Sequence, residues 1–276
     1  MSQPEQLGPL ASAFKDLPAD AHPKQWNAFY EQATHPWDRA GPSLALKDLL
    51  LQRPDLVPPP SPGATALVPG CGLGHDVLLL ASLGYDAWGL DVSETGLAMA
   101  RQNEQDQQNK GYDQYPVREG HERGQVHWVQ ADFFADDWTK GVGTDGTGTG
   151  TFDLVFDYTF LCALPLDLRP RWAKQVTHLL APRGRLVCLE FPVGKPHRDI
   201  GPPWGLNPEV YEALLATPGE PLHYDAQGDG TVVSAPSPKP RDDALHRLSL
   251  IKPLRTHKAG YYEDGTVRDF VSVWSR

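Results

Sequence analysis

The sequence has few cysteines, no long apolar run and no metal-binding spacing among its histidines. Three cysteines in 276 residues, each in an apolar or glycine-rich context, argue for reduced thiols in a reducing compartment. No apolar stretch approaches the length of a membrane span. Residues 1–16 lack the basic start and apolar core of a signal peptide. The ten histidines include no HxxxH or HExxH spacing. We therefore expect a cytoplasmic protein with no metal site and no membrane partner.

The charge balance is acidic, with a formal net charge of −10 at pH 7 and a sequence pI of about 5.4. Such a surface repels phosphate backbones unless a local basic patch reverses the field, and we find no such patch. Arg169, Arg171 and Lys174 have the spacing of a solvated helix face. We therefore expect no nucleic-acid partner. The length fits one large domain with a sizeable core.

Apolar runs and helical patterns alternate from residue 64 onward, which is typical of a parallel sheet with helices on both faces. Two helices are expected before this point, at 23–33 and from about residue 43, and residues 1–22 are expected to be flexible. The later expected strands are 64–69, 86–91, 126–132, 152–158 and 185–191, the helices are 75–84, 93–108, 167–180 and 207–216, and the antiparallel edge segments are 244–252 and 267–274.

Two stretches interrupt this alternation. Residues 139–151 are almost all glycine and threonine, and we interpret them as a surface insertion. Residues 219–242 are long and rich in proline and glycine, which fits either an active-site lid or an insertion.

A glycine turn, "ALVPGCGLGHD" at residues 66–76, joins the first strand of the alternating region to a helix. Backbone N–H groups in such a turn lie next to a ligand. The GxGxG pattern of Gly70, Gly72 and Gly74 is shared by several cofactors, although His75 replaces the third glycine of a dinucleotide fingerprint. At the end of the next strand, Asp91 is placed to accept both hydroxyls of a ribose.

Two further strand ends carry suitable side chains. Asp132 and Phe133 follow the third strand, where an acid accepts from the exocyclic amine of an adenine and an aromatic ring covers its face. Asp157 and Tyr158 end the fourth strand, near the expected reacting carbon. Four successive strand ends with such groups indicate a nucleoside-type cofactor much more strongly than the glycines alone.

The segments "LVPGCGLGHDVLLLASLGYDAWGLDVSETGLAMA", "WNAFYEQATHPWDRAGPSLAL", "FDLVFDYTFLCALPLDLRPRWAKQVTHLLAPRGRLVCLEFP" and "GPPWGLNPEVYEALL" together carry a family resemblance. The sequence resembles the class I S-adenosylmethionine-dependent methyltransferases of the thiopurine methyltransferase superfamily, and within it the thiol/halide methyltransferases. The resemblance covers roughly residues 23–216 and a part near the C-terminus.

The resemblance implies an α/β, Rossmann-like, doubly wound and mostly parallel seven-stranded sheet, with an antiparallel edge strand and an N-terminal helical lid. Residues 23–276 are then one methyltransferase domain. Its parts are expected to be N-terminal lid helices (23–60), a cofactor-binding core (64–192), and an acceptor-side cover with C-terminal strands (193–276). A monomer or homodimer that acts on a small-molecule acceptor is expected.

The resemblance also implies the residues of the site. S-adenosylmethionine, which leaves as S-adenosylhomocysteine, is expected to contact Trp26, Tyr30, Trp37, Gly70, Gly72, Asp91, Asp132, Phe133 and Tyr158. Tyr158 is also the candidate catalytic residue, with a positioning role. Two positions depart from the family pattern: Tyr30 stands where relatives commonly carry tryptophan, and Phe191 replaces a common tyrosine.

The acceptor is inferred from what the chemistry needs. Methyl transfer is an in-line displacement, and a thiolate, hydrosulfide or halide needs little or no proton removal. An alcohol needs a positioned base. We find no clear base, and His197 and Asp199 fit a solvated loop better. The leading hypothesis is therefore a methyltransferase for a small thiol, hydrosulfide or halide. The alternatives are an O- or N-methyltransferase for a specialised metabolite, a non-catalytic S-adenosylmethionine-binding module, and an NAD-dependent oxidoreductase, against which His75 and the Asp132–Phe133 pair argue.

Overall fold

The computed structural model describes residues 7–117, 121–140, 142, 150–225, 232 and 241–276. Within these residues, seven strands form one sheet. The strands are β1 (Thr65–Pro69), β2 (Asp86–Asp91), β3 (Val126–Gln130), β4 (Phe152–Tyr158), β5 (Leu180–Glu190), β6 (His246–Ile251) and β7 (Phe270–Ser275). The α-helices are α1 (Pro9–Phe14), α2 (His22–Glu31), α3 (Leu44–Gln52), α4 (His75–Ser82), α5 (Glu94–Asn109), α6 (Arg169–Leu179) and α7 (Pro208–Ala216). The two expected insertions, 139–151 and 219–242, lie largely outside the described residues.

The sheet has the strand order β3-β2-β1-β4-β5-β7-β6. Strands β1 to β5 pair in parallel, and β7 runs antiparallel to both β5 and the edge strand β6. The expected mostly parallel seven-stranded sheet is therefore confirmed, with the reversed strand one position in from the edge. The strand order reverses between β1 and β4, and ligands of open α/β sheets bind at the carboxyl ends of strands around such a point.

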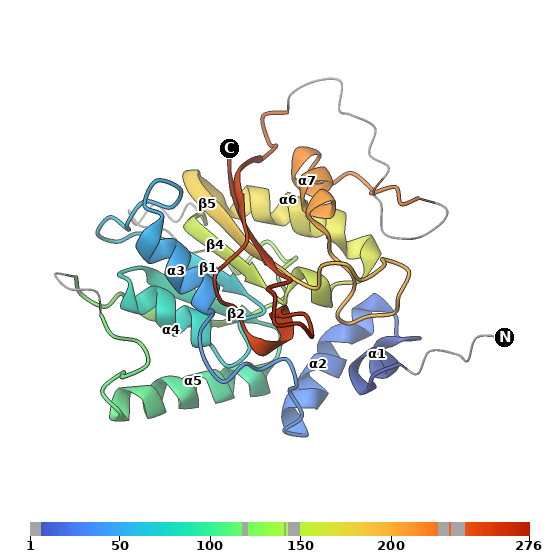
Figure 1. The fold of residues 1–276 in the computed structure, drawn as a ribbon. Coiled ribbons are helices and arrows are strands. Elements are labelled where there is room, and N and C mark those ends of the chain that lie inside the picture. The colour runs from blue at the N-terminus through green and yellow to red at the C-terminus, as the bar shows by residue number, and fades with distance from the viewer. Residues whose placement is uncertain (1–6, 118–120, 141, 143–149, 226–231, 233–240) are drawn as a thin grey trace.

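Helices cover both faces of this sheet. In Figure 1, α3, α4 and α5 lie on one side of the strands, whereas α6 and α7 lie on the other. Strand β1 is buried along its whole length, as expected for a central parallel strand with helices on both faces. Helices α1 and α2 stand apart from these layers, at the end of the sheet where the parallel strands finish.

Local sequence signals set several helix boundaries. The Ser43 and Ser93 side chains accept hydrogen bonds from the backbone N–H groups of Leu46 (3.2 Å) and Gly96 (2.9 Å), so each serine caps a helix N-terminus. Gly84 follows α4 with a positive φ of 99°, a left-handed conformation that glycine adopts without steric cost. These caps explain why α3, α4 and α5 lie close to their expected ranges.

The N-terminal segment differs from the expectation of a flexible 1–22. Helix α1 lies within it, and the ring of Phe14 is buried against α2, 4.6 Å from Trp26 and 6.1 Å from Phe29 between ring centroids. Burial of an aromatic ring stabilises this short helix, which is too short to be stable alone. The described part of this segment therefore belongs to the lid.

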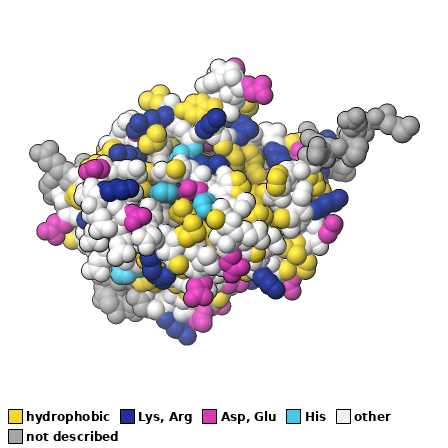
Figure 2. Space-filling view, turned by 90° about the horizontal axis from the view of Figure 1, so that it is seen from below, with side chains coloured by type: hydrophobic (Ala, Val, Ile, Leu, Met, Phe, Trp, Pro, Cys, Tyr) yellow, Lys and Arg dark blue, Asp and Glu magenta, His cyan; other side chains and the backbone are white. Residues whose placement is uncertain are grey.

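Surface side chains of both charges are mixed on the face drawn in Figure 2, with apolar side chains between them. In the part of the chain that the structure describes, no helix is long and apolar enough to cross a membrane.

Candidate active site

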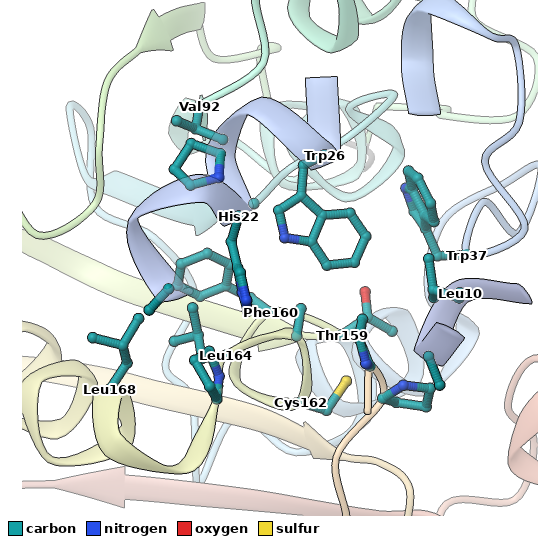
Figure 3. Close-up of a pocket in the computed structure, with 18 of the residues that line it drawn as sticks. Leu10, His22, Trp26, Trp37, Val92, Thr159, Phe160, Cys162, Leu164 and Leu168 are labelled. Carbon is teal, nitrogen blue, oxygen red and sulfur yellow. The ribbon is translucent and has the colours of Figure 1, made fainter. Parts of the chain in front are cut away.

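A large open pocket of about 1440 Å³ lies between the carboxyl ends of the strands and the N-terminal helices. Its floor comes from residues after β1, β2 and β3 and from the segment after β4, and its cover comes from α1, α2 and the loop that follows α2. Figure 3 shows His22 and Trp26 of α2 on one side of this space, with Thr159, Phe160 and Cys162 on the other. Of the residues expected in the site, those that line the pocket are Trp26, Tyr30, Trp37, Gly70, Asp91, Asp132 and Phe133.

Asp91 is the best-defined polar group of the pocket. It ends β2, is 6% exposed, and accepts hydrogen bonds from the backbone N–H groups of Gly72 (3.0 Å) and Ser93 (2.9 Å). Burial raises the pKa of this carboxyl, and the two N–H donors oppose that effect. An ionised carboxylate offers about four lone-pair sites. Asp91 therefore keeps acceptor capacity on its pocket side for a diol, while Gly72 acts through Asp91 and does not itself line the pocket.

The glycine turn allows two aromatic rings to approach the backbone. Gly70 has a φ of 59°, and a Cβ atom there would lie 2.4 Å from Cδ2 of Phe160. Gly74 has a φ of 77°, and its Cβ atom would lie 2.2 Å from the Trp128 ring. Both positions therefore require glycine for conformation and for space. Phe160 also packs edge-on against Phe133, with centroids 5.1 Å apart.

Asp132 and Phe133 occupy different environments after β3. Phe133 is buried at 3% exposure, whereas Asp132 is exposed and accepts a hydrogen bond from the Phe134 N–H at 2.9 Å. Both line the pocket. The pair therefore offers an apolar ring face next to a solvent-accessible acceptor.

The lid is an aromatic cluster on α2 and the loop after it. The Trp37 indole N–H donates to the Tyr30 hydroxyl at 3.2 Å, and Trp37 packs edge-on against Tyr30 and Trp26, with centroids 5.3 and 5.1 Å away. The Tyr30 ring packs on Gly96 at the start of α5, and its hydroxyl lies over Gly72. Tyr30 is thus buried between the lid and the glycine turn, a position that a tryptophan would fill differently.

Two contacts hold the lid loop to the first turn of α4. Asp38 pairs with His75, Oδ1 to Nε2, at 3.2 Å, and the other ring nitrogen of His75 contacts the Tyr115 hydroxyl at 2.9 Å. Asp76 accepts from the Ser43 backbone N–H at 2.7 Å. His75, which stands in place of a third glycine, therefore connects the glycine turn to the residue next to Trp37.

Tyr158 lies beside the pocket and is not among the residues that line it. Its ring stacks on His257 at 5.6 Å and meets Phe191 edge-on at 6.2 Å. Its buried hydroxyl has no hydrogen-bond partner among the described residues, and burial raises its pKa, an effect that the nearby charge of Arg39 partly opposes. Phe191 does line the pocket, as do Arg39 and Thr159.

Sequence reasoning assigned no role to Arg39, Thr159 or Phe160. Thr159 has a φ of 64°, a conformation that is uncommon for a residue other than glycine and that turns the chain sharply after β4. Its place directly after a strand end was the available signal. Of the two weighed bases, Asp199 lines the pocket, while His197 stacks on Tyr224 at 4.3 Å and does not.

These groups fit an adenosine with a charged sulfonium. Asp91 supplies a buried acceptor for ribose hydroxyls, Phe133 and Asp132 offer a ring face and an acceptor, and the lid supplies aromatic faces, which attract cations. No group of three His, Cys, Asp or Glu side chains suited to a metal ion occurs among the residues that the structure describes.

Comparison with known proteins gives the family. The family model for Thiopurine S-methyltransferase (TPMT) matches residues 21–230. Thiocyanate methyltransferase 1 of Brassica oleracea is 32% identical over 218 residues, which cover 79% of this chain and 83% of the relative. Thiocyanate methyltransferase 1 of Arabidopsis thaliana is 35% identical over 194 residues, or 70% and 72% of the two chains.

A solved structure described as "Conversion of a Disulfide Bond into a Thioacetal Group during Echinomycin Biosynthesis" shares the fold, with a TM-score of 0.52, 19% identity and 92% coverage of each chain. The resemblance drawn from the sequence motifs is thus confirmed. The chain belongs to the thiopurine S-methyltransferase family and is an S-adenosylmethionine-dependent methyltransferase.

Proposed function

We propose that this enzyme methylates a small soft nucleophile, namely a thiolate, hydrosulfide, thiocyanate or halide ion. The relatives named above are thiocyanate methyltransferases, and another relative, 32% identical over 201 residues, is the probable thiol methyltransferase 2 of Arabidopsis thaliana. These names make a small sulfur acceptor the first candidate for this chain.

The observation that carries the proposal is the composition of the acceptor end of the pocket. We define this end as Arg39, Phe191 and the pocket-lining residues among 159–168, which include Phe160, Cys162 and Leu164. It is a mainly apolar and aromatic wall, with Arg39 as its cation and Asp167 as its carboxylate. Among the described lining residues, His22 is the only histidine, and its Nε2 contacts the Leu17 carbonyl at 3.2 Å. Such a wall suits a nucleophile that arrives already ionised, because no His–carboxylate pair is set to remove a proton.

The chain's own residues bind the cofactor and exclude water from it. When bound, S-adenosylmethionine supplies an electrophilic methyl group on a sulfonium. We propose that Asp91, held by the Gly72 N–H, binds the ribose hydroxyls, that Gly70, Asp132 and Phe133 hold the rest of the adenosine, and that Trp26, Tyr30 and Trp37 close over the sulfonium. Exclusion of water by these rings leaves a soft anion poorly solvated and therefore reactive. In this scheme Tyr158 positions the acceptor from beside the pocket.

The cysteines support a reducing location. Cys71, Cys162 and Cys188 are free thiols in the structure, and Cys162 and Cys188 are buried. Free buried thiols are typical of proteins in reducing compartments, so we propose that the enzyme works in the cytoplasm.

The test is S-adenosylhomocysteine formation by purified enzyme with S-adenosylmethionine and one acceptor at a time. The panel contains hydrosulfide, thiocyanate, iodide and benzenethiol, with phenol and aniline as shape-matched acceptors that need a base or react as neutral molecules. We expect turnover with the sulfur and halide acceptors and at least 100-fold lower kcat/KM with phenol and aniline, about the lower limit of the contribution of a general base. Faster turnover of phenol or aniline would contradict the proposal and favour an O- or N-methyltransferase.

A further inference from the structure

Of the two charged residues of the acceptor end, Asp167 and Arg39, only Arg39 is a cation. It belongs to the lid loop after Trp37, is half-buried, and lines the pocket. Its guanidinium carbon lies 5.9 Å from the centroid of the Phe191 ring, and its Nη1 donates to the Pro36 carbonyl at 3.3 Å. The loop therefore places a cation against the ring that forms one wall of the acceptor end.

This cation has no anionic partner in the described part of the chain. No described carboxylate oxygen lies within 4.0 Å of it, and the adjacent Asp38 pairs with His75 instead. Its Nε is buried without a hydrogen-bond partner among the described residues. A partly buried cation loses hydration that an ion pair would offset. A small anion in the pocket would provide that partner.

Two guanidinium groups lie over the Phe191 ring, those of Arg39 at 5.9 Å and Arg268 at 5.5 Å from its centroid, and of these two only Arg39 lines the pocket. His257 stacks on Tyr158, and burial lowers its pKa, an effect to which the charge of Arg39 adds, so the imidazole is neutral at pH 7. Asp269 is fully buried and accepts from the Thr256 hydroxyl at 2.8 Å. The buried Tyr158 hydroxyl lies close to Arg39, beside the pocket, and has no hydrogen-bond partner among the described residues.

We propose that Arg39 binds the negative charge of the acceptor and thereby restricts the enzyme to acceptors that react as anions. This inference rests on the proposed function and adds the residue that selects for charge. In the reaction, a lone pair of the anion forms the new bond to the methyl carbon, and the electrons of the broken methyl–sulfur bond pass to the sulfonium sulfur. The anion and the sulfonium cation become two neutral products, and no proton is transferred.

This charge balance predicts how Arg39 contributes to the kinetics. The acceptor is fully charged before transfer and loses charge as the bond forms, so Arg39 binds the ground state at least as strongly as the transition state. Loss of an interaction of this kind raises KM with little change in kcat. Once the product is neutral, it is no longer held by the guanidinium, which favours its release.

The test compares Arg39→Gln, Arg39→Lys and the control Arg255→Gln, which removes the same charge from an exposed ion pair with Asp48. For thiocyanate and hydrosulfide, we expect Arg39→Gln to raise KM about 10- to 100-fold, the factor for one charged hydrogen bond, with kcat within about threefold. Arg39→Lys should recover most of the loss, and Arg255→Gln should match the wild type. Iodide titrated into enzyme loaded with S-adenosylhomocysteine should show the same order of affinities without turnover.

The outcomes separate this inference from the proposed function. Failure of the wild type to methylate any anionic acceptor would overturn the proposed function. Wild-type turnover with an unchanged KM in Arg39→Gln would overturn the role of Arg39 alone. A fall in S-adenosylhomocysteine affinity that matches the rise in KM would also overturn it, because Arg39 would then act on the lid. If Arg39→Gln does not fold, a thiocyanate KM that does not change with ionic strength in either the wild type or Arg39→Lys would count against the proposal, because binding of the anion by a cation at position 39 weakens as salt screens the charge.

Discussion

The cofactor end and the acceptor end of the pocket are assembled in different ways. The cofactor end uses Gly70, Asp91 and Asp132, which follow or end three neighbouring parallel strands. The acceptor end uses Arg39 from the lid loop, the segment after β4, and Phe191 after β5. Strand register alone brings the first set together, whereas the second set depends on contacts between segments far apart in the chain.

This difference explains which contacts fix the positions of the residues at each end. The pairs Pro69↔Leu90 and Leu90↔Val129 fix the ends of β1, β2 and β3 relative to one another. At the acceptor end, side chains pack on side chains, as Arg39 does on Phe191, and beside it Tyr158 packs on His257. We therefore expect changes at the cofactor end to have the larger effects and to act mainly on cofactor affinity.

Asp91→Asn should give the largest effect. The amide removes the charge and turns one oxygen into a donor, while the N–H groups of Gly72 and Ser93 both still need an acceptor. Loss of one charged hydrogen bond costs about 1.5–3 kcal/mol, so S-adenosylhomocysteine affinity should fall at least about 10-fold. Isothermal titration calorimetry measures this directly.

The matched control for this change is Asp55→Asn, which removes an exposed carboxylate paired with Arg53. It should leave the affinity unchanged. An Asp91→Asn enzyme with wild-type affinity would remove Asp91 from the cofactor site. A raised acceptor KM with normal cofactor affinity would mean that Asp91 acts on the acceptor and belongs to the acceptor end.

The next largest effect should be a pH dependence of the folding stability, and it comes from Glu190, the residue before Phe191 of the acceptor end. Glu190 ends β5 next to Phe191, is fully buried, and has no hydrogen-bond partner for either oxygen among the described residues. Burial raises its pKa from the usual 4.5 to about 7, the nearby Ser272 hydroxyl and the charge of Arg247 act against this, and the charges of Glu209 and Glu212 act with it. The folded protein therefore holds this proton in a pH range in which the unfolded chain has released it.

The sign follows from this raised pKa. The contribution of Glu190 to the free energy of unfolding is full below about pH 4.5 and is lost as the pH rises to about 7. At 1.36 kcal/mol for each unit of pKa difference, the loss amounts to about 3 kcal/mol at most. Urea unfolding of Glu190→Gln at pH 5 and pH 7.5 should show a smaller difference than the wild type. The exposed Glu220→Gln serves as the control. An equal difference in all three proteins would show that Glu190 titrates normally.

The parts of the molecule that the sequence predicted well are those with local signals. The caps Ser43 and Ser93 and the stop at Gly84 bound their helices where expected, because each acts within one turn of the chain. Asp91 and Asp132 were predicted to lie together, and they do line one pocket, because carboxyl ends of parallel strands meet at one edge of the sheet.

The parts that the sequence did not predict depend on distant partners. Helix α1 has six residues and is stabilised by Phe14 in a cluster that includes Trp204, far away in the sequence. Arg39 is one arginine in a polar loop, and no spacing marks it as facing Phe191. Tyr158 was placed at the reacting carbon from its strand-end position, but the structure puts its ring beside the pocket, against His257 and Phe191. Its catalytic role remains a prediction.

Gly70→Ala should affect both the cofactor end and the acceptor end. The φ of 59° costs about 1–2 kcal/mol for a residue with a Cβ atom, and that atom would displace the ring of Phe160 from Gly70 and from Phe133. We expect a lower melting temperature, weaker S-adenosylhomocysteine binding and a raised acceptor KM together. Gly41→Ala is the control, since a Cβ atom there meets nothing within 4 Å. If only cofactor binding changed, Phe160 would not link the two ends.

Trp37→Phe should give the smallest effect, because it keeps an aromatic ring in the lid while it removes the N–H donated to Tyr30 and part of the indole ring area. One neutral hydrogen bond contributes about 0.5–1.5 kcal/mol, so S-adenosylhomocysteine affinity should fall roughly 2- to 10-fold. Trp37→Ala should cost more, since it also removes the ring contacts with Trp26 and Tyr30.

A double-mutant cycle with Tyr30→Phe isolates this hydrogen bond, because each single change removes it from one side. The double variant should then lose little more affinity than either single variant. Additive losses would mean that the bond contributes nothing to cofactor binding and that the lid acts through its ring faces alone. In that case the tyrosine at position 30 would substitute for the family's tryptophan by shape, and its hydroxyl over Gly72 would serve only packing.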